Sequence, residues 1–103
     1  MYTKKQFKCD LEKLISICEK ELKNRKYGIN GDGTIQQIEN VILPELYDWI
    51  KKVETNNMPP KNERWFACAA HVLQWGLDWN MKNPSEMMLM IGEVDTKFCN
   101  LEP

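Results

Sequence analysis

Cysteine, histidine and paired carboxylates are the residues of this chain best suited to chemistry. Cys68 and His71 lie three positions apart, so on a helix they would share one face, as in a Cys/His catalytic pair or half of a zinc site. Zinc needs two more ligands, but Cys9 and Cys18 are nine positions apart and would point to opposite sides of one helix. We therefore expect no metal and no cofactor at these residues, with His71 a hydrogen-bonded histidine and Cys68 a packed thiol.

Paired carboxylates occur at Glu45 and Asp48, three positions apart in a second apolar-periodic segment. Such a pair could act as general acid and base, but a solvated helix face explains the same spacing. The sequence contains no GxSxG, HExxH, Walker or dinucleotide-binding motif. We therefore expect that the protein is not an enzyme.

The segment 28–39, GINGDGTIQQIE, has the spacing of a metal-binding loop. Asn30, Asp32 and Glu39 stand where the third, fifth and twelfth positions of such a loop would place oxygen ligands, with glycine at the sixth position. On these residues the segment resembles a calcium-binding EF-hand loop, which would imply a calcium-responsive helical module. Gly28 stands at the first ligand position and has no carboxylate, so a glycine-rich turn between two helices is the other interpretation.

Helical periodicity indicates the fold. Apolar residues recur at spacings of three and four, and the pattern predicts four helices: 3–24, 34–54, 63–79 and 85–100. The predicted fold is all-α, a small antiparallel bundle of four helices forming a single domain, 1–103. Pro44 lies inside the second helix and predicts a kink or a split there.

The third predicted helix is apolar nearly all round, which favours a buried central position. It carries Trp65, Trp75 and Trp79, which would roughly encircle it. Three indoles are hard to bury together in 103 residues, so we expect one of them to reach the surface, where tryptophan favours binding.

Charge and hydropathy limit the function classes. The net charge is −1; residues 1–27 hold eight basic and four acidic residues, whereas residues 28–103 hold six basic and eleven acidic ones. An acidic main body argues against nucleic acid as the partner. No signal peptide and no stretch of about 20 apolar residues is visible, so we expect a cytoplasmic protein with reduced cysteines that does not enter a membrane.

These features favour a protein-binding module. In size and charge the chain resembles small bacterial immunity proteins, antitoxins and phage-encoded inhibitors. A protein of this type would block a toxin or nuclease by steric occlusion, with its acidic residues steering the encounter. Self-association is the other way to cover an apolar patch. The predicted partner-binding residues are acidic or apolar ones of the fourth and second helices: Glu86, Met88, Leu89, Glu93, Asp95, Glu45 and Asp48.

Overall fold

The computed structural model describes residues 2–101, apart from the side chain of Leu77. No strand occurs in this part of the chain. Its helical elements, in chain order, are α1 (Lys4–Lys26), α2 (Ile35–Gln37), the π-helical turn η1 (Ile38–Ile42), α3 (Leu43–Glu54), the 3₁₀ turn η2 (Lys61–Glu63), α4 (Ala67–Gln74), the 3₁₀ turn η3 (Gly76–Asp78) and α5 (Glu86–Cys99).

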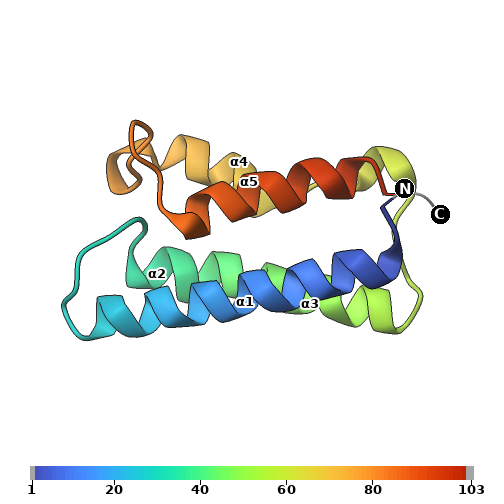
Figure 1. The fold of residues 1–103 in the computed structure, drawn as a ribbon, viewed down its shortest axis with the longest axis horizontal. Coiled ribbons are helices and arrows are strands. Elements are labelled where there is room, and N and C mark those ends of the chain that lie inside the picture. The colour runs from blue at the N-terminus through green and yellow to red at the C-terminus, as the bar shows by residue number, and fades with distance from the viewer. Residues whose placement is uncertain (1, 102–103) are drawn as a thin grey trace.

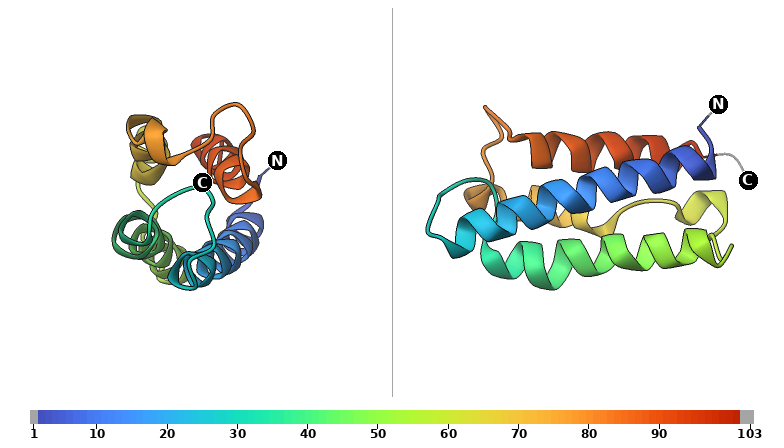
Figure 2. Two further views of the ribbon diagram at one scale, coloured as in Figure 1. Left: turned by 90° about the vertical axis from the view of Figure 1, so that its left-hand side faces the viewer. Right: turned by 60° about the horizontal axis from the view of Figure 1, so that its bottom comes forward.

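The helices form an up-and-down bundle, as predicted. In Figure 1, α1 and the α2–α3 stretch make one layer, and α4 and α5 make the other, with neighbouring helices antiparallel. Viewed along its length, the bundle has α1 beside both α3 and α5, and α4 diagonally opposite α1 (Figure 2). Both ends of the described chain lie at the same end of the bundle.

The first helix follows its sequence pattern closely. The Thr3 hydroxyl accepts the N–H of Gln6, while the Gln6 side chain accepts the N–H of Thr3, so a capping box begins the helix. The helix ends before Gly28, whose φ of 83° is a left-handed conformation that glycine adopts without strain. The predicted apolar stripe is buried from Phe7 to Cys18.

Pro44 neither splits the second helix nor leaves it regular. The chain is helical from Ile35 to Glu54, but a five-residue π-helical turn, closed by a hydrogen bond from Leu43 N–H to Ile38 O, ends two residues before the proline. Because proline has no N–H and its ring would crowd the carbonyl four residues earlier, a wider turn at this point relieves the conflict. The predicted irregularity is therefore present, as a π turn inside a continuous helical stretch.

The predicted helix 63–79 is wrong in its extent and in its place. Only Ala67–Gln74 forms an α-helix, flanked by the two 3₁₀ turns, and it lies at a corner of the bundle rather than at its centre (Figure 2). Leu73 is 72% exposed. Of the three tryptophans in the region, Trp79 is buried and Trp65 is 52% exposed, which confirms that one indole reaches the surface.

An aromatic cluster fills the core at one end of the bundle. Phe7 of α1 stacks on Phe98 of α5 with ring centroids 4.3 Å apart, and Trp49 meets Phe98 edge-on at 4.7 Å. Phe66 packs against the same rings from the segment before α4. Beside it, the buried Arg64 donates to Leu101 O and Pro59 O, which ties the segment to the C-terminal end of α5.

Candidate functional site

The fourth predicted helix carries an exposed line of candidate binding residues. Ser85 caps α5 by accepting the N–H of Met88 with its side-chain oxygen, which sets where the helix begins. Glu86, Leu89 and Glu93 are exposed along it, and Leu89 is 59% exposed. Met88 is half-buried and packs against the core, so its side chain is shared between the core and the surface.

The Glu45 carboxylate forms hydrogen bonds within the fold, instead of lying on the solvated helix face expected for it. It accepts the N–H of Ala67 and the N–H of Cys68, each at 2.7 Å, and the indole N–H of Trp49 at 3.1 Å. The first N–H groups of a helix lack partners within the helix, so α3 supplies the cap that α4 lacks in its own sequence. Glu45 is thus committed to holding α4.

Asp95 has a similar internal role, and Asp48 does not. One oxygen of the half-buried Asp95 accepts the N–H of Phe66 at 2.6 Å, directly before α4. Asp48 is exposed and pairs with Lys52 at 3.1 Å on α3. The structure therefore keeps Asp48 and the exposed line of α5 accessible, but on different layers of the bundle.

A groove between α4 and α5 is the surface feature nearest to the predicted site. It has a volume of about 240 Å³ and is mostly apolar. Its walls are formed by Ala69, Val72 and Leu73 of α4 and by Met88, Ile91, Gly92, Asp95 and Thr96 of α5. We call this feature the α4/α5 groove. The two helices that line it make one layer of the bundle, opposite the layer of α1 and α3 (Figure 1).

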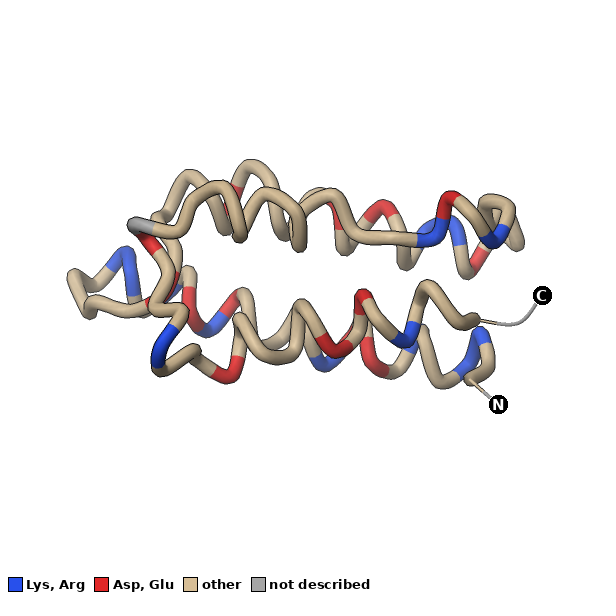
Figure 3. The backbone as a smooth tube through the Cα atoms, turned by 90° about the horizontal axis from the view of Figure 1, so that it is seen from above, with Lys and Arg blue, Asp and Glu red and all other residues tan. Residues whose placement is uncertain are grey.

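The two walls of the groove differ in charge. The α4 sequence ACAAHVLQ contains no Asp, Glu, Lys or Arg, although Ala70, Leu73 and Gln74 are exposed. Figure 3, which looks onto this layer, shows where charged residues lie along the chain. In α5 there are three acids and one lysine, and this lysine, Lys97, pairs with Glu93 at 3.2 Å. Among the residues that line the groove, Asp95 is the one acid, and its carboxylate accepts the N–H of Phe66.

The loop predicted as an alternative calcium site is hydrogen-bonded to the segment between η3 and α5, at the same end of the bundle (Figure 1). The buried Asp32 carboxylate accepts the N–H of Asn80 at 2.8 Å and the N–H of Ser85 at 2.9 Å, and Glu39 pairs with Lys26 at 2.9 Å. Asn30 is exposed. Both carboxylates thus have protein partners, and calcium binding remains a prediction that would require Asp32 to change partners. Among residues 2–101, no group of three or more His, Cys, Asp or Glu side chains could hold a metal ion.

Cys68 and His71 do not share a reactive arrangement. His71 stacks on Trp75, with ring centroids 5.4 Å apart. Burial, together with the charge and hydrogen bond of Glu45, raises the pKa of the Cys68 thiol far above its ordinary value, which keeps it protonated. The buried Cys68 matches the packed thiol expected from the sequence, whereas the contact observed for the His71 ring is stacking on Trp75 and the hydrogen bond expected for it stays a prediction.

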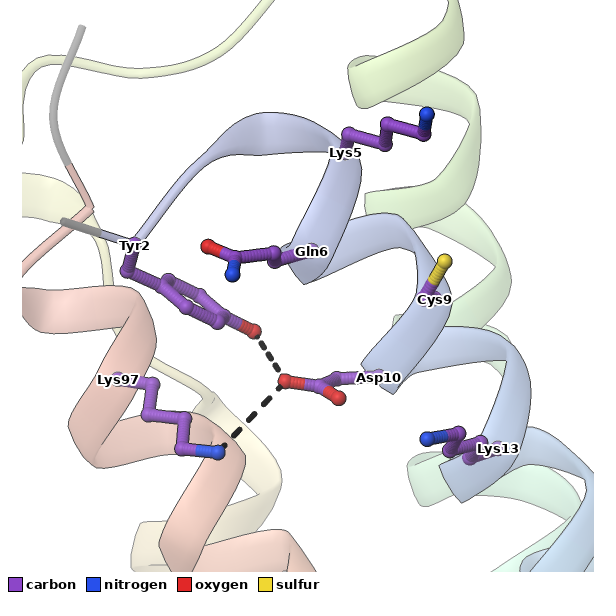
Figure 4. A pocket seen from close by; sticks show the side chains of 7 residues that line it. All are labelled: Tyr2, Lys5, Gln6, Cys9, Asp10, Lys13 and Lys97. Atoms are coloured by element: carbon purple, nitrogen blue, oxygen red, sulfur yellow. Dashed lines mark hydrogen bonds and ion pairs between the residues drawn. The ribbon is translucent and has the colours of Figure 1, made fainter.

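A second hollow lies where α1 meets the end of α5 (Figure 4). The Tyr2 hydroxyl donates to Asp10 at 2.6 Å, and Lys97 approaches the same carboxylate at 3.9 Å. Burial and the Asp10 carboxylate raise the pKa of Tyr2. These contacts tie the first residues of the chain to α5, and the hollow is thus a structural junction.

Sequence reasoning missed the α4 side of the groove. Leu73 and Ala69 were assigned to a buried central helix, because an apolar stretch without a polar face looks the same whether a core or a partner covers it. A further signal was present in Gly92, a glycine in the interior of a helix.

Comparison with protein-family models, curated proteins and solved structures found no match. Within the described residues, no helix is both long and apolar enough to cross a membrane.

Proposed function

We propose that the chain is a small cytoplasmic protein-binding module of the inhibitor or immunity type, without enzymatic activity of its own. It blocks a partner enzyme by covering part of its surface. The observation that carries this proposal is the α4/α5 groove, an apolar hollow between an uncharged helix and an acidic one. Exposed apolar surface next to charged residues is typical of protein-binding sites.

Apolar contact would supply most of the affinity. Leu73 and Leu89 are 72% and 59% exposed in the isolated chain, and burying each would contribute about 1–2 kcal/mol. Met88 adds a flexible side chain that can adapt to the shape of a partner. The contact residues of this proposal are therefore Leu73, Met88 and Leu89.

Glu86 and Glu93 would select the partner and speed its approach. Exposed carboxylates at the edge of an interface contribute little affinity, but they attract a basic surface and repel an acidic one. A toxin or nuclease with a basic substrate channel has the required charge. Glu45 and Asp95 are not part of the proposed contact, because their carboxylates hold the N-terminal end of α4.

Affinity capture from the native host tests this proposal. Wild-type protein is compared with the double variant Glu86→Lys/Glu93→Lys and with the matched control Glu12→Lys/Glu39→Lys, which makes the same change in net charge. The control residues lie on the α1 and α3 layer, since Glu12 lines a groove between these helices and Glu39 pairs with Lys26.

We expect wild type and control to capture the same partner stoichiometrically and the α5 variant to lose it. Purified partner should then be inhibited by the wild-type chain. Equal capture by all three proteins, or a captured partner that keeps full activity, would contradict the proposal.

A further inference from the structure

The side chain of Arg25, near the end of α1, is enclosed by the loop that follows the helix. This side chain is 7% exposed. Its guanidinium donates to the carbonyl oxygens of Ile29 at 3.2 Å, Asp32 at 2.9 Å and Gly33 at 3.2 Å. The Glu21 carboxylate, one turn earlier on α1, accepts a further hydrogen bond at 2.5 Å. Four oxygen atoms from two parts of the chain therefore converge on one positive charge.

Gly31 lets the loop close around this charge. A Cβ atom added at Gly31 would overlap both terminal nitrogens of the Arg25 guanidinium. The backbone at Gly31 is not left-handed, in contrast to that at Gly28 and Gly33. The close approach of the guanidinium, not the backbone conformation, is therefore the reason for glycine at this position.

The oxygen atoms of this loop are those that a calcium ion would need. Calcium takes carboxylate and carbonyl oxygens as ligands. In this loop three carbonyl oxygens accept from Arg25, and the Glu39 carboxylate pairs with Lys26 at 2.9 Å. The Asp32 carboxylate accepts backbone N–H groups of the segment before α5. A divalent ion would have to compete with two cations of the chain itself and would be repelled by both.

We infer that Arg25 is the built-in cation of the 28–39 loop and holds it closed without a metal ion. A guanidinium has five N–H groups in a fixed plane, and four of them have acceptors here. This geometry suits a guanidinium better than the compact ammonium of a lysine. The inference is independent of the proposed function, because it concerns the loop and not the α5 surface.

The closed loop in turn positions the start of α5. Arg25 holds the backbone carbonyl of Asp32, whose carboxylate accepts the N–H of Asn80 and the N–H of Ser85. Ser85 is the residue that caps α5. A chain of hydrogen bonds thus connects α1 to α5 at this end of the bundle and contains no metal-dependent step. We therefore expect α5 to keep one position at any calcium concentration.

The test empties the cation position and refills it. Arg25→Ala should unfold at a lower temperature than wild type, because three carbonyl oxygens and the Glu21 carboxylate lose their donor. Guanidinium chloride at about 20 mM, far below a denaturing concentration, should raise the unfolding midpoint of this variant by at least about 2 °C. The reference for each protein is sodium chloride at the same concentration. Wild type should show no rise, because its own guanidinium fills the position.

Lys23→Ala is the matched control. Lys23 is an exposed residue of the same helix, and its removal changes the net charge by the same amount. This variant should unfold within about 2 °C of wild type and should not respond to guanidinium. An Arg25→Ala chain that is unfolded in sodium chloride should gain helical circular dichroism when guanidinium replaces sodium.

Calcium distinguishes a built-in cation from a metal loop, and this measurement uses the wild-type protein. The unfolding midpoint should be the same in about 10 mM calcium chloride and in EDTA, and calorimetric titration should show no binding heat. Calcium binding by wild type would overturn the inference. It would also be overturned if Arg25→Ala were as stable as Lys23→Ala, or if guanidinium did not stabilise Arg25→Ala more than it does the control.

Discussion

Glu45 of α3 accepts the backbone N–H of Cys68 in the first turn of α4, with oxygen and nitrogen 2.7 Å apart and 23 positions apart in sequence. Its second oxygen accepts the N–H of Ala67. Phe66, at the position that normally caps a helix, has no side-chain hydrogen bond to offer. One carboxylate thus fixes the start of the helix that forms a wall of the candidate groove, and the binding surface depends on a residue that does not itself face a partner.

Removing this carboxylate should loosen α4. Glu45→Ala removes the acceptor of three part-buried N–H groups, those of Ala67, Cys68 and the Trp49 indole, which should cost about 2 kcal/mol of unfolding free energy. Glu45→Gln keeps one acceptor oxygen and should cost less. Asp48→Ala, which removes only an exposed pair with Lys52, should change stability by less than about 0.5 kcal/mol. Urea unfolding followed by circular dichroism measures all three, and equal costs for Glu45→Ala and Asp48→Ala would rule out the cross-helix cap.

Protonation of Asp32 should lower the free energy of unfolding at acidic pH. Burial opposes its ionisation, but the Ser85 and Asn80 hydrogen bonds and the Arg25 charge outweigh burial and lower the pKa of the carboxyl. The folded pKa therefore lies below the unfolded value of about 3.9. The resulting stability is fully present well above pH 4 and is lost as the pH falls through the folded pKa.

Asp32→Asn should remove this dependence. At neutral pH the variant should lose about 1–3 kcal/mol, because Asn80 and Ser85 keep only a weaker, neutral acceptor. The difference from wild type should shrink as the pH is lowered from 6 to 3. Unfolding midpoints in urea across that range measure it, and a constant difference would show that ionisation of Asp32 does not contribute.

Two glycines with the same φ of 83° should respond differently to substitution. Gly28→Ala and Gly33→Ala both place a Cβ in the left-handed region, at about 1–2 kcal/mol each. Only Gly33 also faces the buried ring of Trp79, which is held by a hydrogen bond to Gln37. Gly33→Ala should therefore cost at least about 1 kcal/mol more than Gly28→Ala, as measured by tryptophan fluorescence in urea. Equal costs would mean that the Trp79 ring moves aside freely.

The four cysteines should divide into two reactivity classes. Cys9 and Cys99 are exposed, whereas Cys18 and Cys68 are buried. Burial raises the pKa of Cys18 from 9.0 to about 12, which lowers its thiolate fraction about a thousandfold. Brief alkylation at pH 8 should label two thiols in the native protein and four in urea, with the sites identified by mass spectrometry. Rapid native labelling of Cys68 would contradict the buried position derived for it.

Local sequence patterns predicted the parts of this fold that local forces determine. The helices predicted at 3–24 and 85–100 are found at Lys4–Lys26 and Glu86–Cys99, because their caps and apolar spacings depend on residues within a few positions of one another. The same periodicity accounts for the burial of Ile91 and Phe98 on the inner side of α5.

The region from 63 to 79 could not be predicted in this way. Its backbone is set by partners far along the chain: Arg64 donates to Leu101 O, Asp95 accepts the N–H of Phe66, and Glu45 caps α4. The sequence pattern predicts these carboxylates as surface acids, because their hydrogen bonds span 22 to 29 positions and leave no periodic signal. The same limitation hid the exposure of Leu73.

Gly92→Ala should stabilise the isolated chain. Alanine in a helix interior is more favourable than glycine by about 0.5–1 kcal/mol, and open space around the added Cβ means that no contact opposes the gain. In a domain of this size the unfolding midpoint should rise by roughly 2–8 °C, as measured by calorimetry. Gly28→Ala, where the backbone is left-handed, should lower it. A midpoint that falls for Gly92→Ala would show that the folded chain itself needs glycine at this position.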